Sequence, residues 1–225
     1  MEDLIRILKQ TDLFHSLSEE VIRREILPLG QTTLIPKGQF LIMPQQKLDR
    51  FGILLAGRIH IMHIFSDGSY SLMSALMSPD ALGADLVCTK TQISPYHALA
   101  VETVQLIYFP ITMLTRPGLL REPCRLDVLN QMLMLIANEN MKKEYRLAIL
   151  SQKGLRERIL TYLTMQAGKL RQSTFAISFS REELASFLCV NRSALSHELS
   201  QMQQEGLIRF HKNVFTLTGW EDGTL

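Results

Sequence analysis

The sequence predicts an α+β chain in which an antiparallel β domain is followed by a long helix and a small winged helical domain. Three observations support this fold class. Short apolar runs recur between turn residues from 29 to 110, which is typical of a β-sandwich, barrel or roll. A heptad-like apolar pattern occupies residues 119 to 150. Between 180 and 217 the pattern indicates two short helices, a tight turn and a β-hairpin.

The β domain is expected to cover residues 1–118. Residues 1 to 27 contain helical pieces, one of which begins after Ser18, a good N-cap. Turn residues separate the apolar runs that follow. Asp67-Gly68, flanked by alternating apolar residues, is the strongest hairpin signal.

The segment 119–150 is expected to form one long helix. Its apolar side chains recur in alternating steps of four and three, as in a coiled coil. Two such helices would bury this seam in a dimer, and an Asn within it would pair with its symmetry mate and set the register. The alternative is that the seam packs on the chain's own β domain. The predicted dimer-interface residues are Leu129, Leu133, Ile136 and Asn140.

The domain from 151 to 225 is expected to hold a winged helix-turn-helix. Ser180 and Glu183 have the spacing of a capping box at the start of the first short helix. Asn191 is placed to cap the second helix, and Gly206 ends it. A strand over 175–179 leads into the first helix, and a hairpin follows the second.

The second short helix has an apolar and a polar face. Leu195, Leu199 and Met202 share a buried stripe. The other face carries small residues and hydrogen-bond donors near its N-terminal end, which suits entry into a DNA groove. An ordinary amphipathic helix pair is the alternative, and the hairpin favours the winged motif. The predicted DNA contacts are Arg192, Ser193, Ser196, His197 and Asn191, with Arg181 and Lys212 on phosphates.

Charge and cysteine content restrict the function classes. The net charge is +2, and from 151 onward nine Lys or Arg face seven Asp or Glu, so DNA contact must come from a local patch. Cys88, Cys124 and Cys189 are odd in number and widely spaced. This disfavours a disulfide framework or a metal cluster, and no metal or cofactor is expected. No run approaches the roughly 18 apolar residues of a membrane helix, and the start lacks a signal peptide's apolar core, so we expect a cytoplasmic protein without a membrane partner.

The order of these elements resembles the bacterial CRP/FNR transcription regulators over nearly the whole chain. The resemblance implies a cyclic-nucleotide-binding-type β-roll of the cupin or jelly-roll kind, a dimerisation helix and a winged helix-turn-helix. It also implies a homodimer that binds a two-fold symmetric operator in double-stranded DNA and works with RNA polymerase. The matching pieces are Leu13-Phe14, Pro36-Lys37-Gly38, Leu54-Leu55-Ala56-Gly57, Asp67-Gly68, Ala81-Leu82-Gly83 and the stretch from Arg181 to Ile208.

Residue by residue, the resemblance extends unevenly to the DNA contacts. Arg192 matches the Arg that opens the family's recognition helix. Ser193 stands where many members carry a base-reading Glu, and His197 where many carry an Arg. Because His makes one good bond to a base edge where Arg makes two, a different target sequence is expected. Cys189 stands at a turn position often held by Gly and is expected to be buried and structural, with redox sensing as the alternative.

The effector site is expected to differ from that of the cAMP-binding family members. Those members have a Glu after the Gly that matches Gly83, where this chain has Ala84. Their downstream Arg-Ser pair matches the stretch 94–97, which has no Arg, and none occurs between Arg58 and Arg116. A buried phosphate would lack a partner, which is energetically expensive. We therefore expect an unidentified small effector other than cAMP, in a pocket formed by Gly83, Ala84, Asp85, Asn130 and Met134.

Several alternatives stay open for the β domain. Its core could be apolar and filled, so that the β-roll is only a dimer scaffold. Iron–sulfur members of the family need an N-terminal cysteine cluster, and no cysteine precedes Cys88. Heme ligation by Cys88 and His97 rests on two scattered ligands. A β-roll enzyme is a remote alternative, since the acidic residues lie mostly at turns, without a spacing that suggests catalysis.

Overall fold

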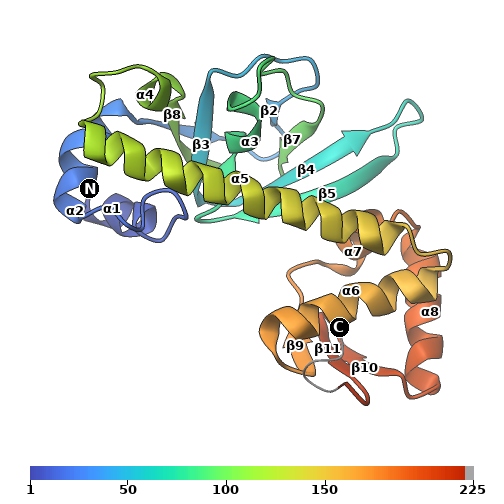
Figure 1. Ribbon diagram of the computed structural model, residues 1–225. Helices are drawn as coiled ribbons and strands as arrows, with labels where there is room; N and C mark the ends of the chain where they lie inside the picture. The colour runs from blue at the N-terminus through green and yellow to red at the C-terminus, as the bar shows by residue number, and fades with distance from the viewer. Residues whose placement is uncertain (221–225) are drawn as a thin grey trace. The chain divides into compact units, whose positions relative to one another are not determined.

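The computed structural model describes residues 1–220, which fold into two compact units (Figure 1). The first unit comprises Met1–Gly68 and Met73–Met141, and the second comprises Ser69–Leu72 and Lys142–Leu225. The predicted domain from 151 to 225 therefore ends outside the described residues.

The first unit, to which β5 belongs from Met73 onward, has two four-stranded sheets, ordered β1-β8-β3-β6 and β2-β7-β4-β5. Strands β1, β3 and β6 pair antiparallel with their neighbours, as do β2 and β4 with β7. The expected antiparallel β architecture is confirmed. The strands are β1 Gln31–Ile35, β2 Phe40–Ile42, β3 Arg50–Ala56, β4 Arg58–Ile64, β5 Tyr70–Met77, β6 Ala81–Leu82, β7 His97–Ala100 and β8 Val104–Pro110.

Aromatic rings at the centre of this unit hold the segment between its first two helices to a sheet. Phe14, Phe51 and Phe109 are fully buried. The Phe14 and Phe109 rings meet edge to face at 5.3 Å, and the Phe51 and Phe109 centroids lie 5.8 Å apart. Such pairs contribute about 1 kcal/mol each beyond their area burial. The expected N-cap is confirmed, because Ser18 Oγ accepts a hydrogen bond from Val21 N.

The shorter helices of the first unit flank the sheets, and one long helix, α5, runs from the first unit into the second (Figure 1). Helix α5 begins at Glu122, three residues later than expected, because Pro123 fits only a first helical turn. The division into units falls inside α5, so the expected boundaries at 118 and 150 stay predictions. The helices are α1 Glu2–Leu8, α2 Glu19–Val21, η1 Ile22–Ile26, η2 Leu27–Leu29, α3 Ala84–Val87, α4 Thr112–Thr115 and α5 Glu122–Leu150.

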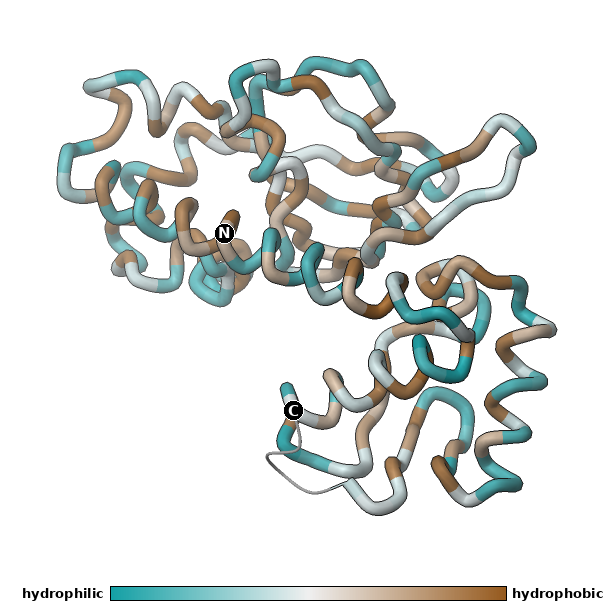
Figure 2. Tube along the Cα trace, turned by 45° about the vertical axis from the view of Figure 1, so that its right-hand side comes forward, coloured by the Kyte–Doolittle hydropathy of each residue, from teal (hydrophilic) through white to brown (hydrophobic). Residues whose placement is uncertain are grey.

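The second unit is a small winged helical fold. Its three-stranded sheet has the order β10-β11-β9. Helix α6 continues through Gly168. Strand β9 stops at Ala176, short of the predicted end at 179. Figure 2 shows apolar and polar stretches alternating along the elements. The elements are α6 Leu155–Leu170, β9 Thr174–Ala176, α7 Arg181–Phe187, α8 Arg192–Gln204, β10 Ile208–His211 and β11 Val214–Leu217.

The predicted buried stripe of α8 is confirmed, since Leu195, Leu199 and Met202 are fully buried. They pack in one core with residues of α6, α7 and all three strands. This leaves the opposite side of α8 exposed. Among the described residues, no helix is long and apolar enough to span a membrane.

Candidate nucleic-acid interface and effector region

Local hydrogen bonds define the start of both short helices of the helix-turn-helix. Ser180 Oγ accepts from Glu183 N at 3.3 Å, and Glu183 Oε2 accepts from Ser180 N at 2.6 Å. This is the predicted capping box. At the start of α8, Asn191 Oδ1 accepts from Ala194 N at 2.7 Å. Each cap is worth about 1 kcal/mol, and together they set where the second helix begins.

The exposed end of α8 brings the predicted reading residues together. Arg192, Ser193 and His197 are exposed, and Ser196 is half-buried beside them. Ser193 Oγ donates to Asn191 Oδ1 at 2.7 Å, so the amide oxygen of Asn191 is used while its NH₂ group remains a donor. Asn191 is the N-cap, and the other four side chains lie within the first two turns of α8, where the helix dipole is positive. This arrangement presents donors to base edges and phosphates.

The turn between the two helices differs from expectation at Cys189. This cysteine is exposed rather than buried. Its backbone has φ of +56°, in the left-handed region that glycine adopts most easily. A Gly therefore suits this position because of the backbone geometry of the tight turn. Burial of the side chain does not account for the preference.

Arg181 has an unexpected role at the wing. Its Nη2 donates to the Lys212 carbonyl oxygen at 3.1 Å. The guanidinium also lies over the rings of Phe210 and Phe215, at 4.9 Å and 5.5 Å from their centroids. Burial, with the neighbouring charge of Arg192, lowers the pKa of Arg181. Arg181 thus ties the wing to the start of α7, and its phosphate contact stays a prediction, whereas the Lys212 side chain is exposed at the wing.

Sequence reasoning missed Arg156, which joins α6 to α8. Its Nε donates to Glu198 at 2.7 Å, and its two Nη atoms donate to Glu205 at 2.6 Å and 2.9 Å. The bonds to Glu205 and then to Glu198 raise the pKa of Arg156. The network neutralises the carboxylate of Glu198, in α8, and that of Glu205, the C-cap of α8. Both would otherwise repel phosphate. No sequence signal could reveal it, because the partners are 42 and 49 residues away.

Around the predicted effector pocket the polypeptide is closely packed. An added Cβ at Gly83 would meet Leu48 Cδ2 at 3.3 Å, and Ala84 is buried. The Tyr96 hydroxyl donates to Asp85 Oδ1 at 3.3 Å. Burial and the nearby carboxylates of Asp85 and Glu139 raise the pKa of Tyr96. Two carboxylates therefore act on the Tyr96 hydroxyl from this region.

The structure does not bring the α5 residues of the predicted pocket to this region. Helix α5 buries Val128 and Met132 against the β domain. At about 100° per residue, positions 130 and 134 fall on the opposite side. Asn130 and Met134 are accordingly exposed, because the face toward the core is set by other residues of the helix.

The predicted seam of α5 is divided between two environments. Leu129 and Ile136 are half-buried against the core of their own unit, whereas Leu133 and Asn140 are exposed. Exposed apolar residues form a different stripe, in which three leucines lie at heptad spacing with Asn140 between the last two. These leucines and their exposed fractions are Leu126 at 54%, Leu133 at 65% and Leu147 at 63%.

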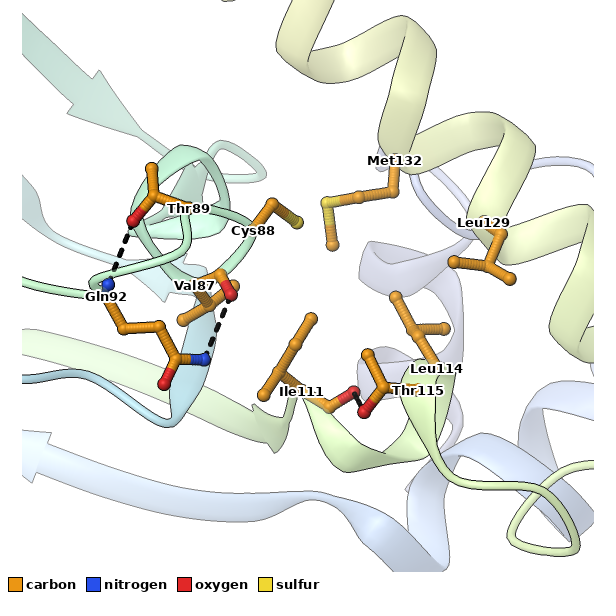
Figure 3. Close-up of a pocket in the computed structure, with 9 residues that line it drawn as sticks. All are labelled: Val87, Cys88, Thr89, Gln92, Ile111, Leu114, Thr115, Leu129 and Met132. Atoms are coloured by element: carbon orange, nitrogen blue, oxygen red, sulfur yellow. Dashed lines mark hydrogen bonds between the residues drawn. The ribbon is translucent and has the colours of Figure 1, made fainter.

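A separate cavity of about 370 Å³ opens between the end of α3, α4 and α5 (Figure 3). None of the residues predicted for the effector pocket lines it. Within residues 1–220, no three His, Cys, Asp or Glu side chains are grouped as a metal site would require. The lining residues are Val87, Cys88, Thr89, Gln92, Ile111, Leu114, Thr115, Leu129 and Met132.

Comparison with known proteins adds independent information. Residues 157–221 match the Crp-like helix-turn-helix domain. The transcriptional activator protein anr of Pseudomonas aeruginosa is 28% identical over 191 residues, which cover 82% of this chain and 74% of that protein. Two solved structures share the fold. One is the c-di-GMP responsive global regulator CLP of Xanthomonas campestris, with a TM-score of 0.69, 14% identity and coverage of 90% of this chain and 100% of that one. The other is FixK2 of Bradyrhizobium japonicum, with a TM-score of 0.63, 15% identity and coverage of 84% and 93%.

Proposed function

We propose that the chain is a DNA-binding transcription regulator of the CRP/FNR type, which acts as a homodimer that reads a two-fold symmetric operator under control of a small effector. The observation that carries the proposal is the exposed N-terminal end of α8, which is fixed by the Asn191 cap and anchored by its buried leucines. A helix held in this way can present its first turns to the major groove.

Within each half-site the side chains have separate roles. Arg192 and His197, with Ser193 and Ser196, contact base edges, because they share the exposed first turns of α8. Lys212, exposed on the wing, contacts phosphate and contributes affinity without sequence preference. In a dimer, two such helices require half-sites about 34 Å apart, one helical turn of DNA.

The second copy of the chain covers the exposed leucine stripe of α5. Leu126, Leu133 and Leu147 occupy heptad-related positions on one face, and the heptad position between the last two holds Asn140. Burial of each contributes about 1.5–3 kcal/mol per chain. Asn140 stands within the stripe, where an amide can pair with its symmetry mate and fix the register. Leu129 and Ile136 support the helix from the other side, through the core of the β domain.

The effector of the β domain is not cAMP. The positions that match the Glu and the Arg-Ser pair of the cAMP-binding members hold Ala84 and, in the stretch 94–97, no Arg. A cyclic phosphate would lack the guanidinium partner that the cAMP-binding members supply at the matching position. A β domain that serves only as a dimer scaffold is the competing proposal, and thermal stabilisation by small molecules separates the two. The regulator works with RNA polymerase in the cytoplasm.

Selection of bound DNA from a random duplex pool tests the proposal, with and without cell extract. We expect one enriched sequence with two inverted half-sites about one helical turn apart. Arg192→Ala should lose the enrichment, whereas Lys169→Ala, which removes an exposed cation from α6, should keep it. A pool that remains random after selection with the native chain would overturn the proposed operator recognition.

A further inference from the structure

The cavity between α3, α4 and α5 has the size and lining of a small-molecule site. Its volume of about 370 Å³ lies at the lower end of the range of roughly 300–1,000 Å³ for ligand pockets. All nine lining residues are uncharged. Cys88 and Thr89 are exposed at the opening, so an ionic ligand that entered would lose part of its hydration, without gaining a counter-charge from the lining, which is unfavourable.

The polar groups of the wall already have partners within the protein. Thr89 Oγ1 donates to Leu86 O at 2.8 Å and accepts from Gln92 N at 3.0 Å. Gln92 Nε2 donates to Val87 O at 3.1 Å. Thr115 Oγ1 donates to Ile111 O at 3.4 Å (Figure 3). With these donors engaged, hydrocarbon and sulfur make up most of the remaining surface.

Two sulfur atoms face each other across the cavity. Figure 3 shows the side chains of Cys88 and Met132 pointing toward one another from opposite walls. A thioether makes favourable contacts with the edges of aromatic rings. Cys88 is exposed at the rim of the cavity, and partial burial with the nearby carboxylate of Asp85 raises the pKa of its thiol, which favours the neutral form. The sulfur atoms therefore favour a flat, polarisable ring without adding charge.

We propose that this cavity binds a neutral, ring-bearing apolar small molecule and is the effector site of the regulator. The effector part of this inference rests on the proposed function. Leu129 and Met132 supply the α5 wall, and the same helix carries the exposed leucine stripe. A ligand that alters how α5 packs on the β domain consequently acts on the helix through which two copies associate.

Two fluorescent probes with one ring skeleton test the charge rule in the full-length protein. N-phenyl-1-naphthylamine is neutral, and 8-anilinonaphthalene-1-sulfonate adds a sulfonate to the same rings. We expect the neutral probe to show saturable fluorescence enhancement at one site per chain. The anionic probe should bind at least about tenfold more weakly than the neutral probe, because its sulfonate finds no counter-charge. Equal or tighter binding of the sulfonate would overturn the assignment.

Substitutions at Cys88 place the probe in this cavity. Cys88→Trp should fill the space and abolish binding of the neutral probe. Lys90→Trp is the matched control, since Lys90 is exposed and lies outside the lining, and it should bind as the native chain does. Cys88→Lys should shift the preference toward the sulfonate. Thermal melts establish that each variant folds. Unchanged binding of the neutral probe by folded Cys88→Trp would show that the probe does not bind in this cavity.

Reciprocity tests the effector role separately. If the cavity is coupled to DNA binding, saturating selected operator should change the affinity of the neutral probe by about fivefold or more, and the probe should change operator affinity by the same factor. An unchanged probe affinity would refute the effector role, although the binding site would stand. Failure to select any operator would instead count against the proposed function, because probe binding is measured without DNA.

Discussion

Two helices of this chain expose faces of opposite character. Helix α8 exposes a guanidinium, hydroxyls and an imidazole at its N-terminal end, whereas α5 exposes leucines at heptad spacing. Polar groups are stable in water, so the α8 face is compatible with the free protein and gains energy only when DNA arrives. Exposed leucines leave apolar surface in water, so the α5 face is expected to find a partner before any DNA is present. The comparison implies that assembly precedes recognition.

The largest expected effect comes from placing a charge in the α5 stripe. Leu133→Asp should convert dimers to monomers, because one leucine per chain is lost, worth about 3–6 kcal/mol for the pair, and a carboxylate replaces it. Sedimentation velocity measures the change. Leu34→Asp is the control, since Leu34 is equally exposed, at 67%, but lies on β1. A Leu133→Asp protein that stays dimeric would remove the distinction between the two faces.

Recognition by α8 should be separable from stability. His197→Ala should relax preference at one base position by about 1–3 kcal/mol, because a single base-edge contact is lost. The melting temperature should stay constant, since the side chain is exposed. Selection from a random pool measures the preference, with His15→Ala in the first unit as control. If the selected operator is unchanged at every position, His197 contacts the DNA backbone or makes no contact with DNA.

The cap of α8 should affect both properties at once. Asn191→Ala removes the acceptor of Ala194 N and should cost about 1 kcal/mol of stability in the DNA-binding unit. Because the first turn of α8 would fray, operator affinity should fall with it. Chemical denaturation and fluorescence anisotropy report the two effects. Asn191→Ser retains a capping oxygen and should restore both, whereas equal losses in the Ser and Ala variants would rule out capping as the cause.

The smallest expected effect concerns the wing. Lys212→Ala should weaken binding to all sequences about equally and reduce the slope of log affinity against log salt by about one unit. The tie from Arg181 should persist, because it uses the Lys212 carbonyl. Titrations at several salt concentrations measure the slope, and Lys169→Ala should leave it unchanged. A sequence-dependent loss would move Lys212 from phosphate contact to base reading.

Short-range sequence patterns explain why much of the DNA-binding unit could be predicted from the sequence. The capping box at Ser180, the cap at Asn191 and the buried stripe of α8 all depend on residues within four positions of each other. These short-range patterns fixed the ends of both helices and left a polar face outward. The antiparallel β region was predicted for the same reason, since turn residues and alternation are local signals.

Only the tertiary structure decided which face of α5 meets the β domain. A heptad pattern contains more than one stripe, and Leu129 and Leu133 belong to the same predicted seam although they end in different environments. The direction of a helix face is set by what packs on it, which the helix sequence does not encode alone. Long-range contacts likewise determined the Arg156 network, the stacking of Arg181 under the wing and the cavity whose walls extend from Val87 to Met132. Such features join residues dozens of positions apart, so they exist only once the chain has folded.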